Sequence, residues 1–193
     1  DPVATIDFLS AEGCTHAGTG TPFFLMYLAA QEARDTPLFP DLKVCPGGGA
    51  PIPPALHARL VNELGGAGAV SGWGLTEAPE LTNGDVTDPN EKIATTEGRP
   101  LPGVDLIAVN SSGDRCAPNE EGELRVKGPQ LMLGYVDAAL NDTAFDAEGY
   151  YRTGDLGVMD AEGFVRITGR LKDIIIRNGE NISAQEVEDL LFA

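Results

Sequence analysis

The sequence predicts an α/β fold in three sections, and three observations support that prediction. Residues 1–98 alternate helix-like apolar stretches with short strands, which predicts part of a parallel α/β subdomain. Residues 99–171 carry short alternating strands separated by glycine turns, which predicts a small antiparallel, barrel-like β subdomain. Residues 172–193 contain an apolar run and then a helix start, which predicts the beginning of a small α+β C-terminal domain.

In the first section, a helix is expected after Pro22, because helices favour proline at an early position. A second helix between two short strands predicts a βαβ unit. The expected elements, in order, are helix 22–34, strand 42–45, loop 46–51, helix 53–64, strand 67–71 and loop 72–77.

The second and third sections follow from alternation and turn residues. The expected strands are 104–110, 122–128, 155–160 and 164–169. The repeated string Asp-Ala-Glu-Gly, at 146–149 and 160–163, does not have EF-hand spacing and predicts tight turns. After the run 173–177 and a Gly-Glu-Asn loop, Ser183 and Glu186 form a capping box that predicts a helix. The chain begins at Asp1 without an initiator Met, so we expect a fragment.

Composition limits the function classes. The net charge of −17, with 13 basic residues, argues against nucleic acid or an anionic membrane as partner. Four basic residues fall within twelve positions, which indicates either a solvated strand and turn or a local phosphate site: Arg166, Arg170, Lys172 and Arg177. Three scattered cysteines predict a reducing cytoplasm, and no apolar run reaches the length of a membrane span. Oligomeric state is not predicted.

Two glycine-containing motifs are candidates for ligand binding. In Gly47-Gly48-Gly49-Ala50-Pro51, glycines let a flat ligand approach the main chain, although a bare turn is the more common reason for such a run and no Walker pattern follows. In Gly72-Trp73-Gly74-Leu75-Thr76-Glu77, Trp73 offers a flat face, the Thr76 hydroxyl suits a phosphate oxygen and the Glu77 carboxylate suits Mg²⁺. The alternatives are a core aromatic and a helix cap.

A third candidate is Asp155, in the string Thr153-Gly154-Asp155 at a turn that enters a strand. A carboxylate can accept hydrogen bonds from both hydroxyls of a ribose, although a turn aspartate that bonds its own backbone is the alternative. Arg170 follows fifteen residues later across a predicted hairpin, so we expect it close to Asp155, where its guanidinium suits phosphate or ribose oxygens.

Together these motifs resemble the adenylate-forming superfamily, which includes acyl-CoA synthetases, peptide-synthetase adenylation domains and beetle luciferases. The matching strings appear in the family's order: GGGAP, GWGLTE, GRPLPGV, GELRVKGPQLMLGY, YYRTGD and GRLKDIIIRNGENISAQEVE. The last string most resembles bacterial acyl-CoA ligases that act on fatty or alicyclic acids.

The resemblance implies roles for single residues. Gly48, Gly49, Ala50 and Pro51 would line the adenine and acyl pocket, and Trp73, with Gly74, would replace the family's tyrosine against adenine. Thr76 and Glu77 would be the catalytic pair, with Thr76 on the phosphate and Glu77 on Mg²⁺. The remaining implied roles are ribose binding for Asp155, ribose or phosphate binding for Arg170, and the hinge for Lys172.

The implied chemistry has two steps. A carboxylic acid attacks the α-phosphorus of ATP to give acyl-adenylate and pyrophosphate, and coenzyme A then displaces AMP. The family's phosphate loop and C-terminal lysine do not occur in these residues, so we expect the chain alone to be inactive. The alternatives are an amino-acid-activating adenylation domain and a non-catalytic nucleotide-binding or interaction module.

Overall fold

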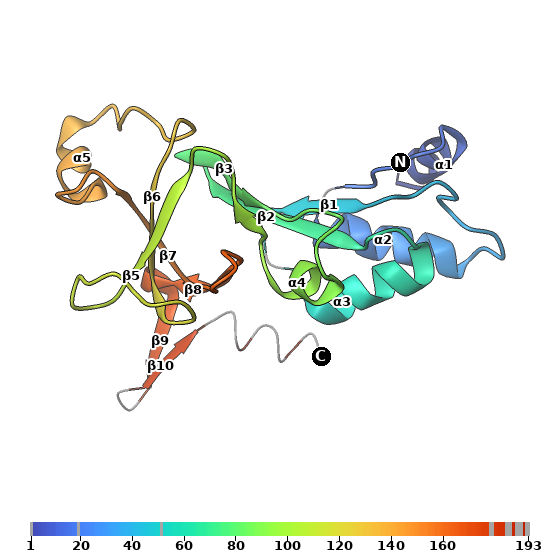
Figure 1. The fold of residues 1–193 in the computed structure, drawn as a ribbon. Coiled ribbons are helices and arrows are strands. Elements are labelled where there is room, and N and C mark those ends of the chain that lie inside the picture. Colours follow the sequence, from blue (N-terminus) through green and yellow to red (C-terminus); the bar gives the residue numbers. More distant parts are fainter. Residues whose placement is uncertain are drawn as a thin grey trace. The chain divides into compact units, whose positions relative to one another are not determined.

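The computed structural model of the chain describes residues 2–18, 20–50, 52–177, 180–183, 187 and 191. The chain divides into two compact units (Figure 1). The first comprises Asp1–Gly72 and Gly84–Thr95, and the second comprises Trp73–Asn83 and Thr96–Ala193. Residues 73–83 thus join the second unit, although they precede the expected boundary after residue 98.

The first unit is built on helices that cover a parallel strand pair. Its elements are α1 (Pro2–Ala11), α2 (Thr21–Glu32), β1 (Cys45–Gly48), α3 (Pro54–Arg59), a π-helical turn (Leu60–Leu64), the start of β2 (Ala69–Leu75) and α4 (Asn90–Thr95). The core forms where buried α2 side chains such as Phe24 and Leu28 meet Leu56 and Leu60. β1 and β2 are parallel and α3 lies between them in sequence, which confirms the expected βαβ unit.

The first strand lies later in the sequence than expected. It covers Cys45–Gly48 rather than 42–45, because the glycine run itself pairs with β2, from Cys45 opposite Ala69 to Gly48 opposite Gly72. β1 is the edge of its sheet, where a proline such as Pro46 is tolerated.

The second unit is an antiparallel β structure. Its elements are β3 (Ala78–Asn83), β4 (Arg99–Pro100), β5 (Asp105–Val109), β6 (Glu121–Lys127), α5 (Ala138–Ala144), β7 (Tyr151–Met159), β8 (Val165–Arg170), a 3-10 turn (Leu171–Asp173), β9 (Ile174–Arg177) and β10 (Glu180–Ser183). The four strands β5-β6-β7-β8 pair in sequence order, each antiparallel to the next. The sheet is therefore an open meander with β5 and β8 as edges, and the expectation of a barrel-like closure is corrected.

The expected loop 72–77 is mostly strand. β2 continues to Leu75, and Thr76 and Glu77 form a two-residue connection to β3, so no helix follows them. Such a short connection requires an antiparallel hairpin. Glycine is needed at position 74, because a methyl group there would overlap the Pro79 carbonyl on β3. The sheet β1-β2-β3-β4 is consequently mixed rather than parallel.

Both Asp-Ala-Glu-Gly strings are tight turns, as expected. Asp146 Oδ1 accepts the N–H groups of Glu148 and Tyr150, and Asp160 Oδ1 accepts those of Glu162 and Phe164. Each aspartate thus bonds its own turn, and the two Asp-initiated loops need no cation to hold their shape.

The C-terminal residues form a hairpin of β9 and β10. Glu180 and Asn181 belong to β10, so they are strand rather than loop, while Asn178 and Gly179 lie outside the described residues. Ser183 is the last residue of β10. Of the helix expected after it, only Val187 and Leu191 are described, and both are helical.

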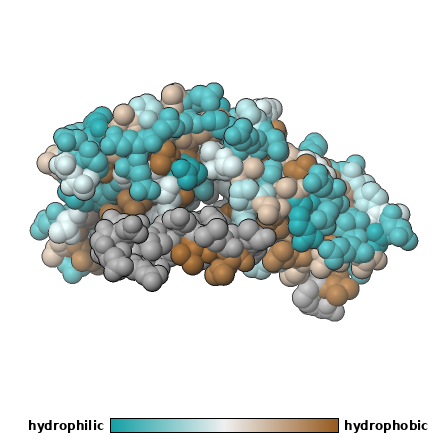
Figure 2. All heavy atoms as spheres, turned by 90° about the horizontal axis from the view of Figure 1, so that it is seen from below, coloured by the Kyte–Doolittle hydropathy of each residue, from teal (hydrophilic) through white to brown (hydrophobic). Residues whose placement is uncertain are grey.

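One face of the molecule is mostly polar. On the face drawn in Figure 2, hydrophilic residues predominate and hydrophobic patches lie between them. Among the described residues, no helix combines the length and the apolar composition that a membrane crossing requires.

Candidate functional site

Asp155 is the centre of the first group of candidate residues. It lies inside β7, directly opposite Arg170 on β8, rather than at a turn before the strand. The Arg170 Nε–H group contacts Asp155 Oδ1 at 2.9 Å, so the expected proximity of the two residues is confirmed. The Asp155 side chain is 5% exposed and that of Arg170 is 53% exposed, so a buried carboxylate is paired with a guanidinium that reaches solvent.

Trp73 holds the other oxygen of the same carboxylate. Its indole Nε1–H donates a 2.9 Å hydrogen bond to Asp155 Oδ2. Trp73 is 8% exposed and packs in the core of the second unit with residues such as Leu124 and Val126. Trp73 is therefore a core aromatic, which is one of the two alternatives from the sequence, and it also donates a hydrogen bond to Asp155, the candidate ribose-binding residue.

Local backbone contacts fix the position of Asp155. Its N–H donates to Thr153 Oγ1 at 3.0 Å, and the Thr153 hydroxyl donates to the Leu124 carbonyl on β6 at 2.7 Å. Gly154 between them has φ of +72°, a conformation that favours glycine. The Thr-Gly-Asp string thus fixes the local backbone so that the Asp155 side chain points inward.

Glu77 forms a second group with two tyrosines. The Tyr135 hydroxyl donates to Glu77 Oε1 at 2.6 Å, and the Tyr135 and Tyr151 oxygens lie 2.9 Å apart. Because Tyr135 gives its proton to Glu77, Tyr151 is the donor to Tyr135. The Tyr135 hydrogen bond, first among several contacts, holds the pKa of Glu77 below its ordinary value. Burial, first among several causes, raises the pKa of Tyr151.

The two tyrosines were missed by reasoning from the sequence. Tyr151 lies on β7, the strand of Asp155, but the register of β7 against β6 shifts between the two residues, so alternation along the strand is interrupted between them. Tyr135 lies in the irregular segment after β6, and its contact with Glu77 across 58 residues has no local signal.

The Glu77 group has the donor set that magnesium uses when it is bound together with phosphate. The lowered pKa keeps the carboxylate ionised, and Tyr135 occupies one of its two oxygens. Among the described residues, no cluster of three or more His, Cys, Asp or Glu side chains is suited to hold a metal. A lone carboxylate suits Mg²⁺ when substrate phosphates supply the other ligands. Thr76 beside it is exposed and open to a ligand.

None of the contacts described above involves the other predicted residues. Gly48, Gly49 and Ala50 are exposed and belong to the first unit, and Pro51 lies outside the described residues. Lys172 is exposed in the 3-10 turn two residues after Arg170. Their assigned roles stay predictions.

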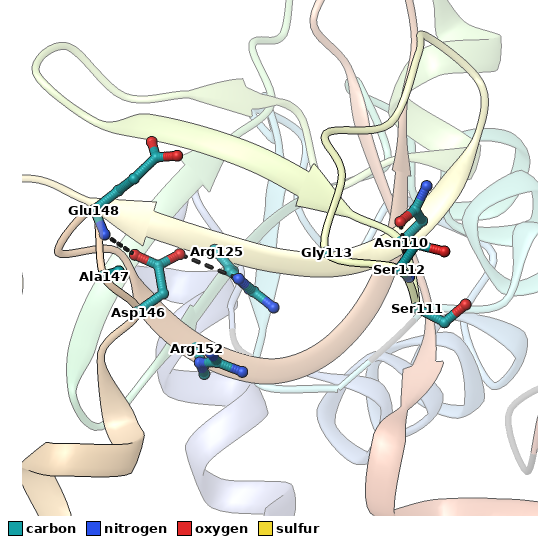
Figure 3. A pocket seen from close by; sticks show the side chains of 9 residues that line it. All are labelled: Asn110, Ser111, Ser112, Gly113, Arg125, Asp146, Ala147, Glu148 and Arg152. Atoms are coloured by element: carbon teal, nitrogen blue, oxygen red, sulfur yellow. Dashed lines mark hydrogen bonds and ion pairs between the residues drawn. The ribbon is translucent and has the colours of Figure 1, made fainter.

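A separate polar pocket of about 450 Å³ lies in the second unit (Figure 3). Arg125 and Arg152, partners on β6 and β7, line it together with the turn at 110–113 and the turn that begins at Asp146. Arg125 is paired with Glu123 at 2.8 Å and with Asp146 at 3.1 Å. Because these acids offset the Arg125 charge, the pocket wall is a structural ion-pair network and we assign it no ligand.

The fold, together with the matches reported below, defines a class, the adenylate-forming enzymes. The chain belongs to the AMP-binding enzyme family, whose model matches residues 1–136. The resemblance read from the motifs is thereby confirmed.

Two relatives and two solved structures illustrate the match. The chain is 37% identical over 192 residues to a medium-chain fatty-acid–CoA ligase of Escherichia coli, covering 99% of this chain and 33% of that protein. It is 38% identical over 172 residues to a salicyl-AMP ligase / salicyl-S-ArCP synthetase of Mycobacterium tuberculosis, covering 88% and 30%.

The structures extend the similarity to nucleotide-bound proteins. ATP-bound MatB from Rhodopseudomonas palustris matches with a TM-score of 0.84 and 26% identity, covering 100% of this chain and 38% of that one. O-succinylbenzoate coenzyme A synthetase from Bacillus subtilis, in complex with ATP and magnesium ion, matches with a TM-score of 0.81 and 28% identity, covering 100% and 39%. The chain thus spans about a third of the length of the relatives that it matches.

Proposed function

We propose that the chain is part of an ATP-dependent acyl-CoA ligase that activates a carboxylic acid as its acyl-adenylate and transfers the acyl group to coenzyme A. The observation that supports this most is the Asp155 group, in which one buried carboxylate is held by Trp73 and Arg170 at 2.9 Å each. That arrangement suits the two hydroxyls of a ribose, and the family is one of AMP-binding enzymes.

The proposed reaction divides between the two groups of residues. In the first step the substrate carboxylate oxygen attacks the α-phosphorus of ATP, and the bond to pyrophosphate breaks. In the second the thiol sulfur of coenzyme A attacks the acyl carbon, AMP leaves and the thiol proton is released. Asp155 and Arg170 would hold the nucleoside, while Thr76 would bind a phosphate oxygen.

Glu77 would hold Mg²⁺ in this site. When bound, the cation neutralises charge that develops on the phosphate oxygens. The contribution of the chain is to keep the Glu77 carboxylate ionised and oriented through Tyr135. Cytoplasmic location stays a prediction from the three cysteines, all of which are free thiols.

A second candidate function has the same first step but transfers the acyl group to a different acceptor. The name of the mycobacterial relative joins AMP formation to transfer onto a carrier protein. An adenylation domain that loads a carrier thiol would use the same nucleotide residues. Steady-state turnover is measured with coenzyme A and, separately, with a carrier protein that bears phosphopantetheine. The acceptor that supports faster turnover distinguishes the two candidate functions.

The test on these 193 residues is binding rather than turnover, because the relatives are about three times longer. We expect calorimetry to show that the chain binds AMP, and that Asp155→Asn weakens binding about tenfold or more, since a charged hydrogen-bond acceptor is lost. A matched variant is Asp105→Asn, which removes a carboxylate that accepts from Tyr150 at 2.6 Å in the same unit. Equal AMP affinity in the wild type and Asp155→Asn would contradict the proposal.

A further inference from the structure

The indole of Trp73 lies in the core cluster of the second unit and is 8% exposed, and the Asp155 side chain beside it is 5% exposed. The polar edge of the indole is directed at this candidate ligand-binding group, because Nε1–H donates to Asp155 Oδ2 at 2.9 Å.

We propose that Trp73 is a positioning residue, whose indole N–H orients the Asp155 carboxylate toward the 2′- and 3′-hydroxyls of the bound nucleotide. The inference rests on the proposed function, which supplies the nucleotide. It deepens that function by giving the tryptophan a role in ribose recognition that acts through Asp155 and not through contact with adenine.

The first reason for this role is the number of acceptor positions on the Asp155 carboxylate. An ionised carboxylate offers about four acceptor positions, two on each oxygen. Trp73 uses one on Oδ2, and the Arg170 guanidinium forms an ion pair with Oδ1. At least one position therefore stays on each oxygen, which is the pattern that a pair of vicinal hydroxyls requires. The hydrogen bond at Oδ2 and the ion pair at Oδ1 also restrict rotation of the carboxylate about its terminal bond.

Trp73 is held more rigidly than Arg170, so it contributes more to fixing the Asp155 carboxylate in place. The Trp73 N–H donates to Thr82 Oγ1 at 3.1 Å, and the fully buried Thr82 hydroxyl donates to the Glu97 carbonyl at 2.6 Å. Trp73 is thus tied to β3 at its backbone and packed in the core at its ring. The Arg170 side chain is 53% exposed and retains freedom to move.

A nucleotide without the ribose hydroxyls distinguishes a positioning role of Trp73 from stacking of Trp73 on adenine. The experiment is calorimetry of the 193-residue chain with AMP and with 2′,3′-dideoxy-AMP, for the wild type and Trp73→Phe. Phenylalanine keeps an aromatic ring and removes the N–H donor. We expect the preference for AMP over the dideoxy compound to fall about fivefold to tenfold in Trp73→Phe, with affinity for the dideoxy compound unchanged within about twofold.

Phenylalanine is smaller than tryptophan, so Trp73→Phe also changes packing. A second variant distinguishes this packing change from loss of the N–H donor. Trp73 is the single tryptophan of the chain, so global incorporation of the analogue 3-benzothienylalanine changes this position alone. The analogue replaces the N–H group by sulfur and keeps the bicyclic shape. It should reproduce the loss of AMP preference while its thermal unfolding stays cooperative.

Tyr150→Phe is the matched control, since it removes another aromatic donor to an aspartate, the 2.6 Å bond from Tyr150 to Asp105 in the same unit. Its AMP preference should equal that of the wild type. An equal loss of affinity for both ligands in Trp73→Phe, or an unchanged preference in the benzothienyl protein, would overturn the inference while leaving the proposed function in place. A wild-type chain with no preference for AMP over the dideoxy compound would contradict the ribose site itself.

Discussion

At the scale of single residues, the candidate site consists of side chains that hold one another in place before any ligand binds. Asp155 accepts a hydrogen bond from Trp73 and forms an ion pair with Arg170, and Glu77 accepts a hydrogen bond from Tyr135, which in turn accepts from Tyr151. Partly buried hydrogen bonds of this kind strengthen one another in a medium of low dielectric constant. Loss of the Tyr135 donor should therefore change the pKa of Glu77 as well as stability.

Tyr135→Phe tests the Glu77 group. The variant removes the donor that lowers the Glu77 pKa, so we expect that pKa to rise toward its ordinary value and the free energy of unfolding to fall by about 1 kcal/mol at pH 7. A carboxyl group with a lowered pKa contributes stability above its unfolded pKa of about 4.3, and the contribution is lost as pH falls through the folded pKa.

Two measurements check this prediction. Carbon NMR of the Glu77 carboxyl reports its pKa, and urea unfolding at pH 7 and pH 3 reports stability. The difference between variant and wild type should shrink at pH 3. Tyr27→Phe, which loses a 2.7 Å bond to the Gly18 carbonyl in the first unit, should leave the Glu77 pKa unchanged. An unshifted Glu77 pKa in Tyr135→Phe would contradict the assignment.

The proximity of Arg170 to Asp155 was predictable from the sequence, because spacing on a hairpin decides which residues meet. Arg170 follows Asp155 by fifteen residues, and a turn between two strands brings such residues opposite each other. The Trp73–Asp155 bond joins residues 82 apart in different sheets, and it depends on the direction of one indole edge in a packed core. No local pattern of the chain encodes such a contact.

At the scale of elements, the hairpin of β2 and β3 and the edge strand β8 shape the surroundings of the site. Expected strand ends were wrong where glycine and proline are common, because turn residues also suit close backbone approach in a sheet. Gly74 was assigned to a loop, yet it lies in β2, where its missing side chain makes room for β3.

Gly74→Ala tests that close approach. An added methyl group would overlap the Pro79 carbonyl, so β2 and β3 must separate. We expect a loss of about 1–3 kcal/mol in the free energy of unfolding, measured by urea titration. Gly18→Ala is a milder comparison, because there the new carbon would lie 3.3 Å from the Pro46 carbonyl oxygen. A neutral Gly74→Ala would show that the hairpin is looser than described.

Glu97 makes the stability contributed by its contact with β8 depend on pH. Its Oε2 accepts the Ile167 N–H at 2.9 Å, beside the register shift between β7 and β8, and burial raises its pKa to about 7. A carboxyl group with a raised pKa contributes stability below its unfolded pKa of about 4.3, and this contribution is lost as pH rises through about 7.

The amide in Glu97→Gln stays neutral and still accepts the Ile167 N–H. We therefore expect Glu97→Gln to be more stable than the wild type by about 1–3 kcal/mol at pH 8 and to match it near pH 4. Thermal or urea unfolding across this range checks the prediction.

At the scale of the whole molecule, the nucleotide residues that carry the argument belong to one compact unit. Trp73, Glu77, Asp155 and Arg170 all lie in the second unit, whereas Gly48, Gly49 and Ala50 lie in the first. The class of fold was predictable because helix and strand patterns separate clearly along the chain. The open edge of the meander was not, because alternation along a strand does not show whether the last strand pairs with the first.

The central claim is that Trp73 and Asp155 form a preorganised ribose site, and the single tryptophan provides the most direct measurement. The indole N–H of Trp73 gives one cross-peak in a ¹H–¹⁵N spectrum, and this proton is the one bonded to Asp155. We predict that AMP shifts the cross-peak in a saturable way, that 2′,3′-dideoxy-AMP at the same concentration shifts it much less, and that Asp155→Asn moves it in the free protein. An indole cross-peak that AMP leaves unmoved at saturation would contradict the account.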